Sequence, residues 1–162
     1  MPEHSERTIG AALLDQTIVA GIGNYLRAEI LFLCQIDPWR KVQELTQPEL
    51  DSLCQIIPQI ARRAYETAGV TASEVDRSRM QQDSTLVYRL GSEFGNRHYV
   101  FRRTNLPCLR CATPIRQQKQ VVHAQDDEEK TRIIYFCPTC QNTSIPLPSR
   151  RKKNRPTITA SA

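Results

Sequence analysis

The sequence lacks long apolar stretches. No apolar run approaches the roughly 20 residues that a membrane-spanning helix needs, although 40% of the 162 residues are hydrophobic. The N-terminus, MPEHSERTIG, lacks the basic and then apolar order of a secretory signal. Apart from two cysteine pairs there is no internal repeat. We therefore expect a cytoplasmic protein with no membrane partner, built as one compact domain or two small ones.

Acidic residues are scarce in the second half of the chain. Residues 1–88 carry 8 Lys and Arg against 12 Asp and Glu, whereas residues 89–162 carry 14 against 5. The net charge of the two parts is therefore −4 and +9, in line with the total of +5. A basic half of this kind favours polyanionic partners, nucleic acid first and an anionic membrane second. A basic tail can also serve solubility alone.

Helical patterns dominate the first 69 residues. Near-helical apolar spacing, with Thr8 as a possible N-cap, predicts a helix that continues to Ala20. The turn Gly21-Ile22-Gly23 breaks it, and a second helix is predicted over residues 24–33. Asp37-Pro38 ends that unit, because the residue before proline is disfavoured in the helical conformation.

A third helix is signalled by Thr46-Gln47-Pro48-Glu49, which has the form of a capping box. Apolar residues then follow the 3.6-residue period, with a kink expected at Pro58 and a stop at Gly69. Cys34 and Cys54 fall within apolar helical patterns, so we expect both to be small core residues.

The remainder of the chain is less regular. Thr71-Ala72-Ser73-Glu74 could cap another short helix, and loose alternation over residues 87–103 predicts extended structure. We expect a mainly α fold: a helix–two-turn–helix bundle over residues 1–90, a small zinc β-hairpin segment over residues 91–143, and a disordered basic tail over residues 144–162.

Two CxxC pairs, Cys108–Cys111 and Cys137–Cys140, are separated by 25 residues. Residues 120–123 and 132–136 read as two strands of a hairpin that would bring the pairs together. Four cysteines then form a closed tetrahedral Zn²⁺ site, with no open position for an activated water. The alternatives are two disulfides, which a cytosolic location disfavours, and a redox dithiol, which lacks a βαβ context. We expect one structural zinc ion.

The stretch GIGNYLRAEIL begins at Gly21 and combines a permissive turn with the start of a helix. The first amides of a helix lack partners and carry partial positive charge, which suits an anion. Glycines at Gly21 and Gly23 remove Cβ atoms that would hold a phosphate away, and Asn24 could cap the helix and donate from its amide. The alternative is a tight corner without a ligand.

Two long segments resemble the formamidopyrimidine-DNA glycosylase and endonuclease VIII family. Residues 13–31 are similar to its helix–two-turn–helix element, and residues 132–141 are similar to the end of its zinc finger, including the glutamine after the last cysteine. Residues 99–108 look like the segment that leads into the finger. The resemblance covers about residues 8–141 and is closer to the endonuclease VIII branch, in the Tyr-Leu after Asn24 and the Ile-Ile-Tyr-Phe before Cys137.

This resemblance implies damaged-DNA binding within base excision repair, with double-stranded damaged DNA as the partner. The residue matching Asn24 binds a phosphate near the lesion together with the glycine-turn amides, and the residue matching Arg132 contacts phosphates beside the flipped nucleotide. Arg132 could otherwise be an ordinary solvent-facing arginine. The DNA-contacting candidates are Gln16, Gly21, Gly23, Asn24, Tyr25 and Arg132.

In the family, the chemistry belongs to an N-terminal β-sandwich domain with a proline nucleophile followed by a glutamate. This chain begins Met1-Pro2-Glu3, but the helical unit follows within a few residues, so we interpret the match as coincidence and assign no catalytic residue. We expect the C-terminal, DNA-binding part of such a glycosylase and lyase: a monomer that is inactive alone, with a separate catalytic domain as a further partner. The alternatives are a stand-alone nucleic-acid module without enzymatic activity, directed to DNA or to RNA, and a zinc-stabilised protein-interaction adaptor.

Overall fold

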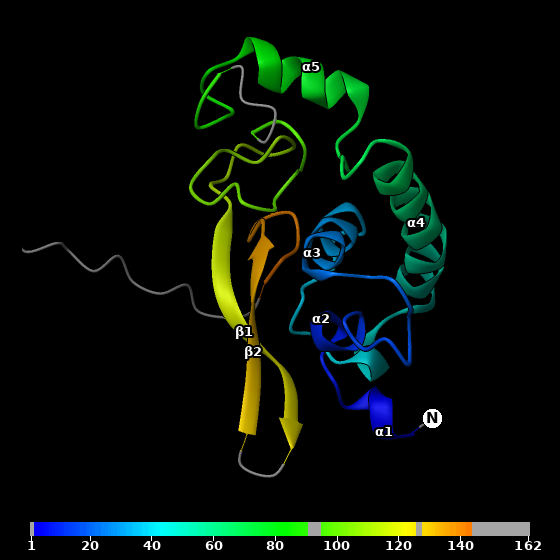
Figure 1. Cartoon of the computed structure of the whole chain (residues 1–162). Helices are drawn as coiled ribbons and strands as arrows, with labels where there is room; N and C mark the ends of the chain where they lie inside the picture. The colour runs from blue at the N-terminus through cyan, green and yellow to red at the C-terminus, as the bar shows by residue number, and fades with distance from the viewer. Residues whose placement is uncertain (1, 91–94, 126–127, 144–162) are drawn as a thin grey trace, which may run out of the picture.

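The computed structural model describes residues 2–90, 95–125 and 128–143 (Figure 1). Helices precede one antiparallel hairpin, in the order that the sequence predicted, and the predicted tail lies outside the described residues. The elements are α1 (Pro2–Ser5), α2 (Ile9–Ala12), α3 (Asn24–Leu33), the 3₁₀ helix η1 (Val42–Glu44), α4 (Gln47–Glu66), α5 (Glu74–Gln82), β1 (Arg116–Gln125) and β2 (Glu128–Phe136).

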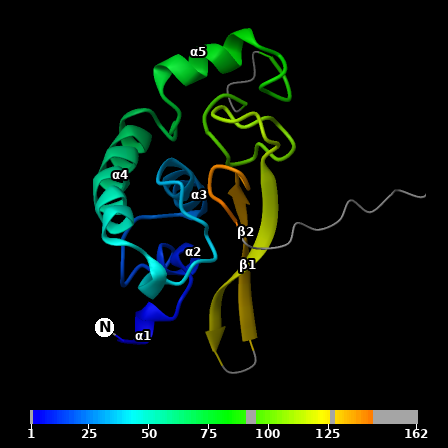
Figure 2. The ribbon, with the colours of Figure 1, turned by 180° about the vertical axis from the view of Figure 1, so that it is seen from behind.

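Helix α3 lies at the centre of the fold. The hairpin lies along one side of it and α4 covers the other side, an arrangement that both ribbon views show (Figures 1 and 2). Helix α2 packs against β1. Among the described residues, none of the helices is long and apolar enough to cross a bilayer.

Helix α2 is shorter than the pattern predicted. Thr8 is its N-cap, and its hydroxyl accepts from the amide of Ala11 at 3.3 Å, as expected. The predicted continuation to Ala20 is wrong, because the chain turns after Ala12. The Asp15 carboxylate accepts from the amide of Thr17 at 2.9 Å and from its hydroxyl at 2.6 Å. Such local side-chain bonds compete with a helical backbone.

Helix α4 confirms its capping box, since Thr46 and Glu49 accept from each other's backbone amides. The helix continues through Pro58, and Gly69, at φ +102°, follows its end and donates from its amide to Ala64 at 2.7 Å. Cys34 is half-buried, but Cys54 is exposed, so its assignment to the core was wrong. The buried stripe of α4 is narrow and passes through the neighbouring Leu53 instead.

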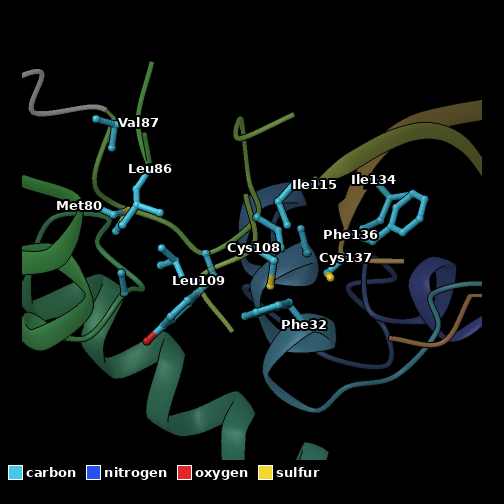
Figure 3. Packing of buried hydrophobic residues seen from close by; sticks show 14 residues of the cluster. Phe32, Met80, Leu86, Val87, Cys108, Leu109, Ile115, Ile134, Phe136 and Cys137 are labelled. Atoms are coloured by element: carbon cyan, nitrogen blue, oxygen red, sulfur yellow. The ribbon is translucent and has the colours of Figure 1, made fainter. Parts of the chain in front are cut away.

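Helix α3 contributes to two buried clusters. Leu26, Ile30 and Leu31 pack against α4 and the N-terminal segment. Ala28 and Phe32 join the second cluster, which contains side chains of α5, the cysteine segment and β2 (Figure 3). Each fully buried large apolar side chain contributes about 1.5–3 kcal/mol. This second cluster therefore draws on residues from both sides of the predicted boundary at residue 90, a division that stays a prediction.

The prediction of extended structure over residues 87–103 was wrong. The described part of this segment, 87–90 and 95–103, consists of turns and bends. The fully buried carboxylate of Glu29 accounts for this. It accepts from the amides of Tyr99 at 2.7 Å, Val100 at 2.8 Å and Phe101 at 3.0 Å, and from the hydroxyl of Thr71 at 2.7 Å. Three successive amides can converge on one carboxylate only if the backbone curves around it.

The hairpin docks through Gln120, which is 2% exposed. Its amide donates to the carbonyl of Pro38 at 2.8 Å and to the hydroxyl of Thr8 at 3.3 Å, and its Oε1 accepts from Arg27 at 2.9 Å. A Cβ on Gly10 would lie 2.3 Å from that Oε1. The absence of a side chain at Gly10 is thus what lets β1 approach α2.

Candidate nucleic-acid interface and metal site

The four cysteines predicted as ligands come together at the base of the hairpin. Their Sγ atoms all lie within 4.8 Å of one another. Cys108 and Cys140 are 3.8 Å apart and Cys111 and Cys137 are 3.4 Å apart. A tetrahedron with metal–sulfur bonds of about 2.3 Å has edges of about 3.8 Å, so the spacing fits Zn²⁺. All four cysteines are free, which excludes two disulfides.

The electrostatics of the cluster also call for a cation. A hydrogen bond from Cys137 lowers the pKa of Cys108 to about 5. The same pairing raises the pKa of Cys137, and burial together with the Cys111 thiol raises the pKa of Cys140 to about 12. The thiols therefore share protons, because neighbouring thiolates repel one another. A bound divalent metal removes this conflict by binding all four as thiolates.

Gln141 ties the cysteine cluster to α3. Its side chain is 1% exposed. Its Oε1 accepts from the amide of Cys137 at 2.9 Å, and its Nε2 donates to the carbonyl of Ile36, just beyond α3, at 3.0 Å. The metal site therefore fixes the hairpin against the helix whose opposite end carries the glycine turn.

The N-terminus of α3 is open. Gly23, not Asn24, is the N-cap residue, and no side chain caps the first turn. The expected capping by Asn24 was therefore wrong, since Asn24 is already the first helical residue. Gly21 has φ +86°, the left-handed region that favours glycine, and a Cβ on Gly21 or Gly23 would meet nothing within 4 Å. Gly21 and Gly23 are exposed, so a ligand can approach the backbone at the start of α3 without meeting a side chain at either position.

Gln16 holds the glycine turn in shape. Its Oε1 accepts from the amide of Gly21 at 2.9 Å, and its Nε2 donates to the carbonyl of Ile22 at 3.1 Å. Both ends of the exposed side-chain amide are thus engaged within the loop. This geometry gives Gln16 a structural role, and its predicted contact with DNA stays a prediction.

Asn24 joins the helix to the hairpin. Its Nδ2 donates to the carbonyl of Ile133 on β2 at 3.0 Å, and its Oδ1 accepts from Arg27 at 2.6 Å. Tyr25 points elsewhere: its ring packs against His98 at 5.3 Å and Phe101 at 6.0 Å between centroids. Neighbouring residues of one helix turn thus face two different surfaces.

Arg132 is exposed on β2, opposite Gln120. Its guanidinium donates to the carbonyl of Thr131 at 3.2 Å, and within residues 2–90, 95–125 and 128–143 no carboxylate pairs with it. A groove of about 730 Å³ is lined by Arg132 together with Gly23 and Asn24. The full lining is Arg7, Ala11, Leu14, Asp15, Gln16, Thr17, Ile22, Gly23, Asn24, Val122, His123, Lys130 and Arg132.

The groove, which we call the cationic groove, unites four of the predicted contacts: Gln16, Gly23, Asn24 and Arg132. Gly21 and Tyr25 do not line it. The sequence analysis missed Arg7, His123 and Lys130. Lys130 pairs with His123 across a β-bulge that shifts the register after Val121, so their position depends on a break in alternation that no sequence signal marked. Arg7 is neutralised by an ion pair with Asp15.

A second groove, of about 440 Å³, lies on the Tyr25 side of α3 and was also missed. Its lining combines aromatic rings and guanidinium groups: Tyr25, Ala68, Gly69, Arg97, His98, Phe101 and Arg102. The rings of His98 and Phe101 meet edge to face at 5.3 Å. Burial lowers the pKa of His98, which favours its neutral form. We call this the aromatic groove.

Comparison with known proteins shows which family the chain resembles. Residues 2–76 match the family described as "Formamidopyrimidine-DNA glycosylase H2TH domain". The chain is 35% identical over 139 residues to a formamidopyrimidine-DNA glycosylase of Thermus thermophilus, covering 86% of this chain and 46% of the relative. It is also 35% identical over 150 residues to a "Probable endonuclease 8 2" of Streptomyces coelicolor, covering 93% of this chain and 46% of the relative.

Among solved structures, the glycosylase of Lactococcus lactis in complex with DNA containing an abasic site aligns with a TM-score of 0.62 and 26% identity, covering 85% of this chain and 43% of that one. The chain thus spans less than half the length of these relatives. Equal identity to both branches supports the family without favouring endonuclease VIII. The chain therefore carries an H2TH domain of the formamidopyrimidine-DNA glycosylase and endonuclease VIII family.

Proposed function

We propose that this chain is the DNA-binding part of a base-excision-repair glycosylase and lyase of the endonuclease VIII type. The observation that carries the proposal is the cationic groove, in which the open N-terminus of α3 and the exposed Arg132 line the same space. Had these two features lain on opposite faces, no single nucleic-acid backbone could reach both. Their shared groove suits a polyanion that passes between helix and hairpin.

The proposed contacts are phosphate contacts. The first amides of α3, bare of side-chain caps, take one phosphate, and the Asn24 amide donates beside them. Arg132 takes a neighbouring phosphate, with a guanidinium fork suited to its oxygens. Lys130 adds a charge on the same strand. Gln16 and Gly21 support this contact from the turn, and Tyr25 is proposed to contact DNA on the other side of the helix. Such contacts position a duplex without reading its sequence.

The aromatic groove offers a place for a base. Tyr25, His98 and Phe101 present aromatic rings, and the guanidinium of Arg102 lies over the Phe101 ring at 5.4 Å. An extruded base loses its stacking partners and gains new ones on such a surface. Because Tyr25 adjoins Asn24 in the helix, a phosphate at Asn24 and a base at Tyr25 would belong to nearby nucleotides.

One structural zinc ion completes the proposal, with Cys108, Cys111, Cys137 and Cys140 as ligands. When bound, it supplies folding energy to a hairpin that has little core of its own. Four thiolates leave no position for catalytic water. Base removal and strand cleavage would therefore need a separate catalytic domain, and we propose that the chain alone binds as a monomer and does not cleave.

Fluorescence anisotropy tests this function directly. The chain is titrated with a duplex that carries an abasic-site analogue, with the intact duplex, and with duplex RNA of the same sequence. We expect tightest binding to the abasic duplex, weakening steeply with salt. Asn24→Ala and Arg132→Ala should weaken binding while zinc content is retained. Equal binding to all three would support a nucleic-acid module outside repair, and no salt-sensitive binding would refute the proposal.

Catalytic competence is tested by borohydride trapping on an abasic oligonucleotide. We expect no covalent adduct from this chain alone, because the proline nucleophile that the resemblance implies belongs to a β-sandwich domain outside the matched H2TH region. A trapped adduct that disappears in the Pro2→Gly variant would show that the chain is a lyase by itself.

A further inference from the structure

Arg27 is a buried cation for which the described residues supply no carboxylate partner. The residue is 0% exposed. Its guanidinium donates to four neutral oxygens: Asn24 Oδ1 at 2.6 Å, Gln120 Oε1 at 2.9 Å, the Ile133 carbonyl at 3.2 Å and the Gly10 carbonyl at 3.3 Å. Its Nε has no partner. Within the described part of the chain, no carboxylate lies at ion-pair distance from Arg27.

A charge in this position is costly unless something offsets it. Buried arginines are as a rule paired, since removing a charge from water costs several kcal/mol. Here burial and the nearby Arg132 lower the pKa of Arg27 to about 10, so the guanidinium is still charged at neutral pH. The two cations repel each other across the floor of the cationic groove, and the groove between them is where a counter-ion would fit.

The bonds of Arg27 fix the polarity of Asn24. A free asparagine amide can rotate to present either its oxygen or its nitrogen to a ligand. Arg27 holds Oδ1 inward at 2.6 Å, so the oxygen is turned away from the groove. The Nδ2 group donates one hydrogen to the carbonyl of Ile133, which leaves its second hydrogen for a ligand. Asn24 is thereby set as a donor, which is the polarity that an anion requires.

We propose that Arg27 is a positioning residue for phosphate binding: it orients the Asn24 amide as a donor and supplies a buried positive charge beneath the groove, without touching the ligand. This inference rests on the proposed function, because it assumes that the groove takes a phosphate. Arg27 does not line the groove, so it cannot act as a direct contact. The phosphate is, in this view, the anion that the buried guanidinium lacks.

A double-mutant cycle with the abasic duplex as the probe tests the inference. The variants are Arg27→Gln, Asn24→Ala and the double variant. A fourth variant, Arg27→Lys, keeps the positive charge but lacks the planar guanidinium with its several donors. We expect Arg27→Gln to weaken binding about tenfold in the wild-type background and less than about threefold in the Asn24→Ala background, since Arg27 acts through Asn24. Arg27→Lys should fall between wild type and Arg27→Gln.

The salt dependence separates positioning from contact. Loss of a phosphate contact at Arg132→Ala should lower the slope of log affinity against log salt by about 0.9, whereas Arg27→Gln should leave the slope unchanged. Zinc content and thermal melting of each variant report folding. Should Arg27→Gln fail to fold, Asn24→Asp replaces it: we expect a carboxylate, which has no donor for a phosphate, to weaken duplex binding more than Asn24→Ala does.

The outcomes are distinct. Additive effects of Arg27→Gln and Asn24→Ala, or a reduced salt slope in Arg27→Gln, would overturn the positioning role while leaving the proposed function intact. Asn24→Asp that binds the duplex no more weakly than Asn24→Ala would also overturn it. Absence of salt-sensitive duplex binding by the wild-type chain would overturn the proposed function, and the inference with it.

Discussion

Gly10 offers a sharp test of how the hairpin is attached to the helices. Gly10→Ala adds a Cβ that would lie 2.3 Å from Oε1, 2.8 Å from Nε2 and 2.9 Å from Cδ of Gln120. A side chain at the protein surface would move aside at little cost. Gln120 is 2% exposed and forms hydrogen bonds with Pro38, Thr8 and Arg27. Moving it therefore breaks buried hydrogen bonds that water cannot replace.

The magnitude follows from two opposing terms. Alanine in a helix is favoured over glycine by about 1 kcal/mol. Against this, displacing Gln120 breaks its hydrogen bonds to Pro38, Thr8 and Arg27, at about 0.5–1.5 kcal/mol for each neutral bond and about 1.5–3 kcal/mol for the bond to the charged guanidinium. The second term wins, and we expect a net loss of about 2–4 kcal/mol in the free energy of unfolding. The hairpin should also move, which predicts weaker DNA binding.

Urea unfolding followed by circular dichroism measures the first effect. Gly23→Ala is the matched control, because its Cβ meets nothing within 4 Å and its φ of −97° suits any residue. Because Gly23 is the N-cap of α3, where alanine is less favourable than glycine, we expect that control to lose no more than about 1 kcal/mol. The double variant Gly10→Ala/Gln120→Ala should be more stable than the sum of its single changes predicts, since the second removes the clash. A stable Gly10→Ala with wild-type DNA affinity would refute the reasoning.

Three further predictions follow from single contacts. Arg40 holds the pKa of Glu49 below its ordinary value of 4.5, so the stabilisation is present above that value and lost as the pH falls from about 4.5 through the lower folded pKa. Glu49→Gln should flatten acid unfolding in this window. A strong zinc chelator should abolish DNA binding while circular dichroism retains the helical signal of α3 and α4, and Cys137→Ser should do the same. Glu29→Gln turns an NH₂ group toward donors that the carboxylate satisfied, which should cost about 2–4 kcal/mol in urea unfolding.

Local signals in the sequence predicted elements well. The bounds of α3, residues 24–33, follow from the glycine turn and an apolar period, and the capping box at Thr46 predicted the start of α4. The cysteine pairs predicted the hairpin, because a four-ligand site requires its two halves to meet. For the two helices, neighbouring residues carried the information that the local structure needed, whereas the hairpin followed from the requirement that four ligands meet.

Long-range contacts explain what the sequence could not predict. The turns around Tyr99 depend on Glu29, which is 70 residues away in the chain and looks in sequence like any helical glutamate. The bulge near His123 and the bonds of Gln120 depend likewise on partners from distant elements. Asn24 was identified from the glycine turn and then from the resemblance, and Arg132 from the resemblance, but that they line one groove became visible only in the fold.

The central claim, that the N-terminus of α3 and the hairpin form one DNA-binding surface, is tested most directly by titrating the ¹⁵N-labelled chain with abasic-analogue duplex and following each amide. We expect the amides of residues 22–24 and 130–133 to shift together with one saturation curve, while those around the exposed Tyr65 on α4 remain unchanged. Shifts confined to one of the two segments, or centred on the outer face of α4, would contradict the account.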